Sequence, residues 1–200
     1  MSAFGWLEGP RVIRGRRPRK PDLVAMRRVV DPRWYAADGE PVRRWRHRAP
    51  RALRTAVGVV FQQPRLSADP RLRLTDLIAE PLRATDRREE TGERVPELAA
   101  TVGLTPDLLG RRPHEVSDGQ LQRACLARAL VLRPRWLICD EMTAMLDAST
   151  TAALVTVVEE YRSSTGAGLL AVGHDRVLLR RWCDRTADWE SLAPAAGNRP

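Results

Sequence analysis

The chain has 200 residues, of which 43% are apolar and 30% charged, and this balance is typical of a folded globular domain. No apolar run approaches the roughly 20 residues that a membrane-spanning helix needs, and the first twenty residues place their basic cluster after a weakly apolar start, the reverse of a secretory signal. The three cysteines are scattered and form no C-x-x-C pair, which argues against a disulfide framework or a zinc site and for a cytoplasmic protein.

The net charge of +9 belongs to the first quarter of the chain. Residues 1–54 hold 15 basic and 5 acidic residues, whereas residues 55–200 hold 19 basic and 20 acidic. Almost every basic residue is arginine, and this skew fits a coding bias better than a nucleic-acid-binding surface. Binding to nucleic acid or anionic lipid stays open as an alternative. This segment is rich in Pro, Gly and Arg without a helical or strand period, so we expect it to be poorly ordered.

From Thr55 onward the pattern changes to runs of strand and helix length. Apolar or β-branched runs predict buried strands at 55–62, 135–141 and 168–175. Apolar residues at helical spacing predict helices at 74–84, 94–104, 118–132, 150–165 and 176–186, the second ending near Gly103 and the fourth at Gly166. Because strands and helices alternate, we predict an α/β fold with a largely parallel sheet.

Asp140 and Glu141 are adjacent carboxylates at the end of the strand predicted at 135–141. Like charges repel and burial penalises both, so the pair needs a cation or a polar substrate. A strand ending in Asp-Glu is expected of a nucleotide hydrolase, in which the first acid helps to hold Mg²⁺ and the second polarises the attacking water. Alone the pattern is weak, because acidic loop residues often follow an apolar strand.

Three further features accompany the acidic pair. The sequence SDGQ, residues 117–120, opens the helix predicted at 118–132 and matches the S-x-x-Q capping box. It indicates either a well-capped helix or a helix N-terminus that faces an anion, with Gly119 allowing close approach. Gln62 follows the first strand, where it could touch a metal or water, and His174 ends the third, where it could bond a terminal phosphate.

Together and in order, four segments resemble the ATP-binding subunit of ABC transporters. VFQQP looks like the Q-loop, EVSDGQLQRACLARAL like the signature motif with its helix, LICDEMTAMLD like the Walker B strand and D-loop, and AVGHD like the switch-histidine loop. The resemblance covers about residues 37–189, and FQQPRLSADPRLRLTDLIAEPLR is similar to the peptide- and nickel-importer branch. It implies a P-loop NTPase-like core over 55–190 with a helical subdomain at about 66–133, followed by a disordered tail over 191–200.

At the ends of the strands, the resemblance implies a catalytic centre. Gln62 would couple Mg²⁺ and the attacking water to the membrane subunit, so it counts as both a metal-binding and a catalytic residue. Asp140 would bind Mg²⁺ through water, Glu141 would be the general base, and His174 would sense the γ-phosphate of ATP.

Across a dimer, the resemblance implies a second set of contacts. Ser117, Gly119 and Gln120 would touch the γ-phosphate of ATP held by the opposite protomer, and Asp147 would link the two protomers. The implied cofactors are ATP and Mg²⁺. The implied partners are the membrane subunits, a second ATP-binding subunit in a homo- or heterodimer and, indirectly, a solute-binding protein, with nucleic acid the least favoured. The implied location is the cytoplasmic face of the cell membrane, as a peripheral subunit.

The chain departs from the family pattern at two motifs. The signature usually reads Leu-Ser-Gly-Gly-Gln and here reads VSDGQ, so Asp118 adds a like charge near ATP. That charge should weaken contact with the γ-phosphate unless Asp118 points away. Met142 stands where the family has a proline after the catalytic glutamate, which removes no catalytic group.

The larger departure concerns the P-loop, G-x-x-x-x-G-K-[ST], whose amides cradle the phosphates and whose lysine neutralises them. The chain contains no G-K-[ST], and its single lysine, Lys20, lies in RPRKPD. AADGEPVRR resembles the hairpin shortly before the Q-loop, so the P-loop is expected around the first few residues or earlier. We therefore expect the N-terminal part of the fold to be incomplete, with residues 1–54 in place of the P-loop part, as in a truncated, mis-started or frame-shifted relative.

The leading hypothesis is an ATP-binding and ATP-hydrolysing subunit of a peptide- or nickel-type ABC importer, impaired in its own site but able to offer its signature motif to an intact partner. One alternative is a non-enzymatic remnant or partner-binding module. Another is a soluble ABC protein that acts on nucleic acid or the ribosome, for which the basic N-terminal segment is the argument. The transported substrate is not encoded here, because the binding protein and membrane subunits select it.

Overall fold

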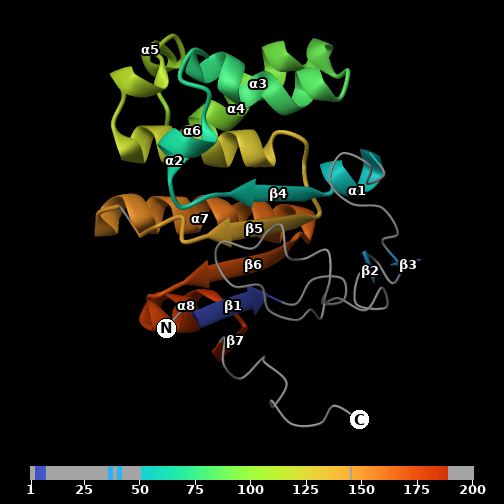
Figure 1. The fold of residues 1–200 in the computed structure, drawn as a ribbon, viewed down its shortest axis with the longest axis vertical. Helices are drawn as coiled ribbons and strands as arrows, with labels where there is room; N and C mark the ends of the chain where they lie inside the picture. The colour runs from blue at the N-terminus through green and yellow to red at the C-terminus, as the bar shows by residue number, and fades with distance from the viewer. Residues whose placement is uncertain (1–2, 8–35, 38–39, 42–50, 145, 189–200) are drawn as a thin grey trace, which may run out of the picture.

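The computed structural model describes residues 3–7, 36–37, 40–41, 51–144 and 146–188, and Figure 1 shows their arrangement. One five-stranded sheet has the order β4-β5-β6-β1-β7, and a layer of helices lies beyond its β4 edge (Figure 1). The strands are β1 (Ala3–Leu7), β4 (Val57–Val60), β5 (Trp136–Asp140), β6 (Gly168–Gly173) and β7 (Arg185–Asp188). The α/β class predicted from the alternation of strands and helices is confirmed.

Strands β4, β5 and β6 run parallel and form the centre on which the functional residues depend. Val60 pairs with Cys139, and Asp140 pairs with Val172, so the carboxyl ends of all three strands meet at one edge. Strands of a parallel sheet are covered on both faces, which explains why all three were recognisable as short apolar runs.

The N-terminal segment contains structure that its sequence pattern did not predict. Strand β1 pairs antiparallel with both β6 and β7, and helix α1 spans Arg51–Thr55. Strand β1 has no period of its own to reveal it, because its hydrogen-bond partners lie more than 160 residues away. Apart from residues 36–37 and 40–41, the remainder of residues 1–54, including Lys20, lies outside the described residues, and so does the tail over 191–200.

The short hairpin expected from AADGEPVRR is confirmed. Strands β2 (Ala36–Ala37) and β3 (Glu40–Pro41) pair antiparallel, with Ala36 opposite Pro41. The two residues between the strands in the sequence, Asp38 and Gly39, form one of the dipeptides that favour a tight hairpin turn.

The five predicted helices are present. They are α3 (Leu74–Ala84), α4 (Thr91–Thr101), α6 (Asp118–Leu130), α7 (Ala148–Thr165) and α8 (Arg176–Trp182). Helix α8 is shorter than the predicted range of 176–186, because the chain turns at Cys183 and enters β7, where it pairs with β1. Four shorter helices complete the described chain: α2 (Pro64–Ser67), η4 (Arg88–Glu90), α5 (Pro106–Leu109) and η5 (Pro113–Glu115).

Glycine ends two of these helices as expected. Gly103 follows α4 with φ of +72°, and Gly166 follows α7 with φ of +71°. This left-handed conformation is the common helix terminator, and glycine adopts it without a steric penalty. The domain boundaries, including the helical subdomain at about 66–133, stay a prediction.

Helix α6 is the centre of the core. Its buried side chains include Leu121, Leu126 and Leu130, and it packs against α3, α4 and strand β4. The approach to β4 is close, since a Cβ on Gly58 would lie 2.7 Å from the carbonyl oxygen of Ala129. Helix α6 therefore joins the helical layer to the sheet. In the part of the chain that the structure describes, no helix is both long and apolar enough to cross a bilayer.

Candidate nucleotide site

Four of the residues predicted to be functional come together where the parallel strands end. Asp140 is the last residue of β5, Glu141 follows it, Gln62 lies two residues beyond β4, and His174 follows β6. We refer to these four residues as the sheet edge. Their placement follows from the parallel register, which brings the carboxyl ends of neighbouring strands to the same level.

Glu141 occupies the sheet edge in an unusual conformation. Its side chain is only 6% exposed, and its φ of +48° is one that non-glycine residues rarely adopt. The backbone N–H of Glu141 donates to the carbonyl of Val172 at 2.8 Å, and its Oε1 lies 3.0 Å from Nε2 of His174. A conformation that costs roughly 1–3 kcal/mol is retained only where surrounding contacts enforce it, and such residues cluster at functional sites.

Gln122 supports the sheet edge from helix α6. This side chain is 1% exposed, and its Nε2 donates to the carbonyl of Phe61 at 3.0 Å and to the carbonyl of Met142 at 3.1 Å. Phe61 precedes Gln62 and Met142 follows Glu141, so one amide group ties together the chain segments that carry two predicted catalytic residues.

The sequence analysis did not single out Gln122, although a signal was present. It lies between Leu121 and Arg123 and one turn before Cys125 and Leu126, and a glutamine buried beside such apolar side chains needs hydrogen-bond partners. Its Oε1 is buried and accepts no hydrogen bond from the described residues. Only the fold shows that its partners lie 61 and 20 residues away.

The capping box predicted for SDGQ is confirmed at the start of α6. The backbone N–H of Gln120 donates to Oγ of Ser117 at 3.2 Å, and the backbone N–H of Ser117 donates to Oε1 of Gln120 at 3.0 Å. The backbone N–H of Leu121 donates to the carbonyl of Ser117 at 2.9 Å. The side chains of Ser117 and Gln120 thus hold the first turn of α6 in place.

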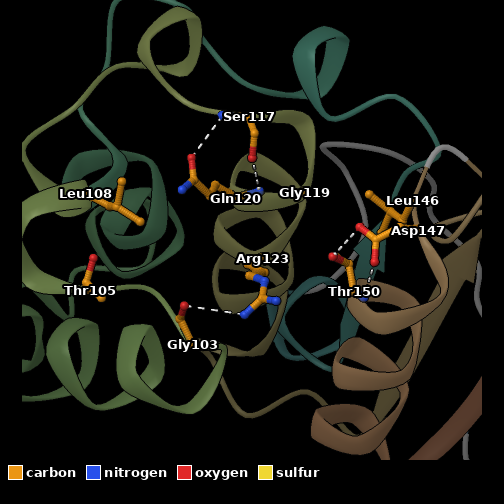
Figure 2. A pocket seen from close by; sticks show the side chains of 10 residues that line it. All are labelled: Gly103, Thr105, Leu108, Ser117, Gly119, Gln120, Arg123, Leu146, Asp147 and Thr150. Atoms are coloured by element: carbon orange, nitrogen blue, oxygen red, sulfur yellow. Dashed lines mark hydrogen bonds between the residues drawn. The ribbon is translucent and has the colours of Figure 1, made fainter.

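An open pocket of about 460 Å³ lies in front of this turn (Figure 2). Its wall combines the start of α6, the segment after α4 and the start of α7, and it brings together the four residues predicted to act across a dimer. We call it the signature pocket, and its lining residues are Gly103, Thr105, Leu108, Ser117, Gly119, Gln120, Arg123, Leu146, Asp147 and Thr150.

Asp147 forms the α7 side of the signature pocket, where it is the N-cap of that helix. Its Oδ1 accepts from the Ser149 hydroxyl at 2.6 Å and from the Thr150 N–H at 2.9 Å, and its Oδ2 accepts from the Thr150 hydroxyl at 2.8 Å. The Ser149 hydroxyl first, and then the Thr150 groups, hold the pKa of Asp147 well below its ordinary value of 3.8. The carboxylate is therefore ionised at neutral pH.

Gly119 and Arg123 shape the middle of the signature pocket. A Cβ built on Gly119 would lie 3.4 Å from Cγ2 of Thr150, an ordinary contact, so α6 tolerates a side chain here. Arg123, which the sequence analysis also missed, donates from Nη1 to the carbonyl of Val102 at 3.2 Å and to that of Gly103 at 3.4 Å. Figure 2 shows the bond to Gly103. These bonds fix the segment after α4 against α6.

Comparison with known proteins decides the family. Residues 34–144, more than half of the chain, match the family model described as ABC transporter. The chain belongs to the ABC transporter family. The resemblance inferred from the four motifs is thereby confirmed.

One similar relative is the oligopeptide transport ATP-binding protein OppF of Escherichia coli, 40% identical over 138 residues. That match covers 68% of this chain but only 41% of OppF. Among solved structures, cbiO1 of Clostridium perfringens, part of the ABC transporter complex cbiONQ, has a TM-score of 0.63 and 25% identity. The structural match covers 74% of this chain and 58% of cbiO1.

The fold is also similar to the ATP-binding cassette MJ0796, solved as a dimer bound to ADP and Pi. Its TM-score is 0.58 at 23% identity, with 69% of this chain and 65% of the cassette covered. At this identity the likeness concerns the fold alone.

The donor set of this ABC chain suits only part of a Mg-nucleotide site. The described residues include no cluster of three or more His, Cys, Asp or Glu side chains that could hold a metal ion. Asp140 and Gln62 offer the oxygen ligands that Mg²⁺ accepts when water and phosphate complete its shell. The phosphate cradle of a P-loop has no counterpart in the sequence, which lacks G-K-[ST].

Proposed function

We propose that the chain acts as an ATP-binding-type subunit of an ABC importer of the peptide-transporting kind, with its signature pocket completing a nucleotide site on a partner subunit. The observation that carries the proposal is the composition of this pocket. It gathers Ser117, Gly119, Gln120 and Asp147, while the chain contains no G-K-[ST]. The likeness to OppF, named for oligopeptide transport, supports peptide as the cargo.

The chemistry of the signature pocket suits the terminal phosphates of ATP. The first turn of α6 lines the pocket, and a helix N-terminus favours an anion through its dipole and the backbone amides that have no partner within the helix. The capping box keeps that turn rigid, and the lack of a side chain at Gly119 lets a phosphate oxygen approach the backbone. In this proposal Asp147 faces the partner subunit across the same pocket.

At the sheet edge, the same proposal assigns the roles that the family motifs imply. Mg²⁺ bound to ATP would offset the negative charge on the phosphates. Asp140 would hold that ion through water, together with Gln62. Glu141 would accept a proton at Oε1, the atom that bonds to His174 in this structure, and His174 would move from that bond to the phosphate. Full use of the sheet edge requires a phosphate cradle on the same chain.

The assembly proposed here is a dimer of ATP-binding subunits on the cytoplasmic face of the cell membrane, docked to two membrane subunits. In a heterodimer with an intact subunit, one nucleotide would lie between the P-loop of the partner and the signature pocket of this chain.

The test compares a substitution in the signature pocket with one at the sheet edge, in a complex of this chain with a P-loop-containing ABC subunit. We expect the isolated chain to show no submicromolar binding of Mg-ATP. In the complex, Gly119→Ala should lower the ATP hydrolysis rate on the order of 100-fold, because it blocks approach to preorganised amides. Glu141→Gln should change the rate less than about 2-fold, since the hydrolysed ATP uses the carboxylate of the partner.

Gly92 offers a matched control for Gly119. It is likewise the second residue of its helix, α4, and a Cβ there would meet nothing within 4 Å. Gly92→Ala should leave hydrolysis unchanged. If Glu141→Gln stops hydrolysis and Gly119→Ala does not, the chain uses its own sheet edge and the proposal is wrong.

A further inference from the structure

The aspartate that distinguishes this signature turn has a specific partner. Asp118 replaces the glycine usual in the family, and its Oδ1 lies 2.6 Å from Nε of Arg65. Arg65 is the second residue of α2, three residues beyond Gln62. The ion pair therefore joins the segment that follows the sheet-edge glutamine to the first turn of α6.

The rest of the Arg65 guanidinium is also engaged. Its Nη1 donates to the carbonyl of Pro113 at 2.8 Å, and its Nη2 donates to the carbonyl of Val116 at 3.1 Å. A planar guanidinium has donors in a fixed fork, so one side chain can hold a carboxylate and two carbonyls at set positions. All three acceptors lie in the six residues 113–118, which lead into α6.

This pairing determines which way the Asp118 carboxylate points. Ser117, Gly119 and Gln120 line the signature pocket, whereas Asp118, although it lies between them, is not among its lining residues. The carboxylate is directed to Arg65 instead, and its charge is neutralised there. The concern that Asp118 would repel an anion in the pocket depends on its pointing inward, and the structure has it pointing away.

We propose that Arg65 is a positioning residue that holds Asp118 out of the signature pocket and neutralises it, so that the pocket accepts the triphosphate of a nucleotide. This inference rests on the proposed function, because it concerns the same pocket and the same class of ligand. Without Arg65, an unpaired carboxylate would be free to turn toward the phosphates. The loss would then come from Asp118, and removing its charge would reverse it.

The pair is a poor candidate for a purely stabilising contact. The side chains of Arg65 and Asp118 are 47% and 49% exposed, and ion pairs at such exposure contribute little to folding. A role in ligand binding and a role in stability can therefore be separated by experiment.

The experiment measures Mg-ATP-dependent association of the full chain with the P-loop-containing ABC subunits of the same cell, for the wild type, Arg65→Gln, Asp118→Asn and the double variant. We expect Arg65→Gln to weaken association about 10-fold, within the usual range of coupling between sites. Adding Asp118→Asn should restore the affinity to within about 2-fold of the wild type. Asp118→Asn should melt at nearly the same temperature as the wild type. Arg65→Gln and the double variant should melt at nearly the same temperature as each other, because both lose the same bonds to the carbonyls of Pro113 and Val116.

Arg71 provides the matched control, because it forms an exposed ion pair with Asp69 nearby, at 2.8 Å between Nη2 and Oδ2. Arg71→Gln should leave association unchanged. If Arg65→Gln has no effect, or the double variant stays as weak as Arg65→Gln, the inference is overturned while the proposed function stands. If the wild type fails to associate with any of these subunits in Mg-ATP, the proposed function itself is overturned.

Discussion

The sheet edge and the signature pocket both gather polar residues, but the hydrogen bonds that fix those residues differ in range along the chain. At the sheet edge, Gln122 bonds to carbonyls 61 and 20 residues away, and both Gln122 and Glu141 are buried. In the signature pocket, the bonds of Ser117 and Asp147 join residues three apart on exposed helix ends. Geometry at the sheet edge thus depends on the whole fold, whereas each of the two helix ends in the pocket is held by its own local cap.

This difference predicts that substitutions near the sheet edge will cost stability, while those in the signature pocket will change binding and leave the fold intact. Paired substitutions of the same residue type in the two regions test that division.

The largest loss of stability is expected from Gly58→Ala in strand β4. The added methyl group would lie 2.7 Å from the carbonyl oxygen of Ala129 in α6, and a backbone atom cannot move aside cheaply. Such overpacking should lower the free energy of unfolding by about 1–3 kcal/mol in urea denaturation. Gly173→Ala is the control, because a Cβ at the end of β6 meets nothing within 4 Å. Equal stability of the two variants would contradict the close β4–α6 packing.

Gln122→Leu should have the next largest effect. It leaves the carbonyls of Phe61 and Met142 buried without their donor, which should lower the free energy of unfolding by about 1–2 kcal/mol. The control is Gln120→Leu on the exposed side of the same helix, where loss of half the capping box should cost less. Should the two leucine variants unfold at the same urea concentration, the bridging role assigned to Gln122 would be wrong.

Gly119→Ala should raise the stability of the fold slightly even though we expect it to slow ATP hydrolysis in the complex. Alanine is favoured over glycine in a helix by roughly 0.5–1 kcal/mol, and the site has room for a Cβ. Urea denaturation of the isolated chain measures this gain, which Gly92→Ala should match. A destabilised Gly119→Ala would mean that lost hydrolysis reflects misfolding and not a blocked phosphate.

The smallest effect concerns the pH dependence of the α7 cap. Because hydrogen bonds lower the folded-state pKa of Asp147, its contribution to stability is present above pH 3.8 and is lost as the pH falls through the lowered pKa. Asp147→Asn keeps a capping oxygen but does not titrate. Thermal melting between about pH 5 and pH 2 should show a steeper loss of stability for the wild type than for this variant. If melting temperature falls with pH equally in the wild type and in Asp147→Asn, the Asp147 carboxylate does not contribute to stability in this way.

The features of the fold that could be predicted from the sequence are those that depend on neighbouring residues. The capping box of Ser117 and Gln120 and the glycine ends of α4 and α7 need only neighbours within one helical turn, and all were predicted correctly. The apolar runs of β4, β5 and β6 were recognisable because a covered parallel strand is apolar throughout its length. Strand β7 was missed, because it is defined by pairing with the distant β1.

The sequence by itself determined the family, the parallel strands and the helix caps, since these follow from order and spacing along the chain. It also predicted the eight residues assigned to a nucleotide site, and that assignment stays a prediction. Only the tertiary structure decided that Gln122 bridges two strand ends, that Glu141 is held in a left-handed conformation against His174, and that Arg65 draws Asp118 away from the pocket. Each of these depends on contacts between segments far apart in the chain, and hydrogen bonds of that kind form only when packing of the core brings the segments together.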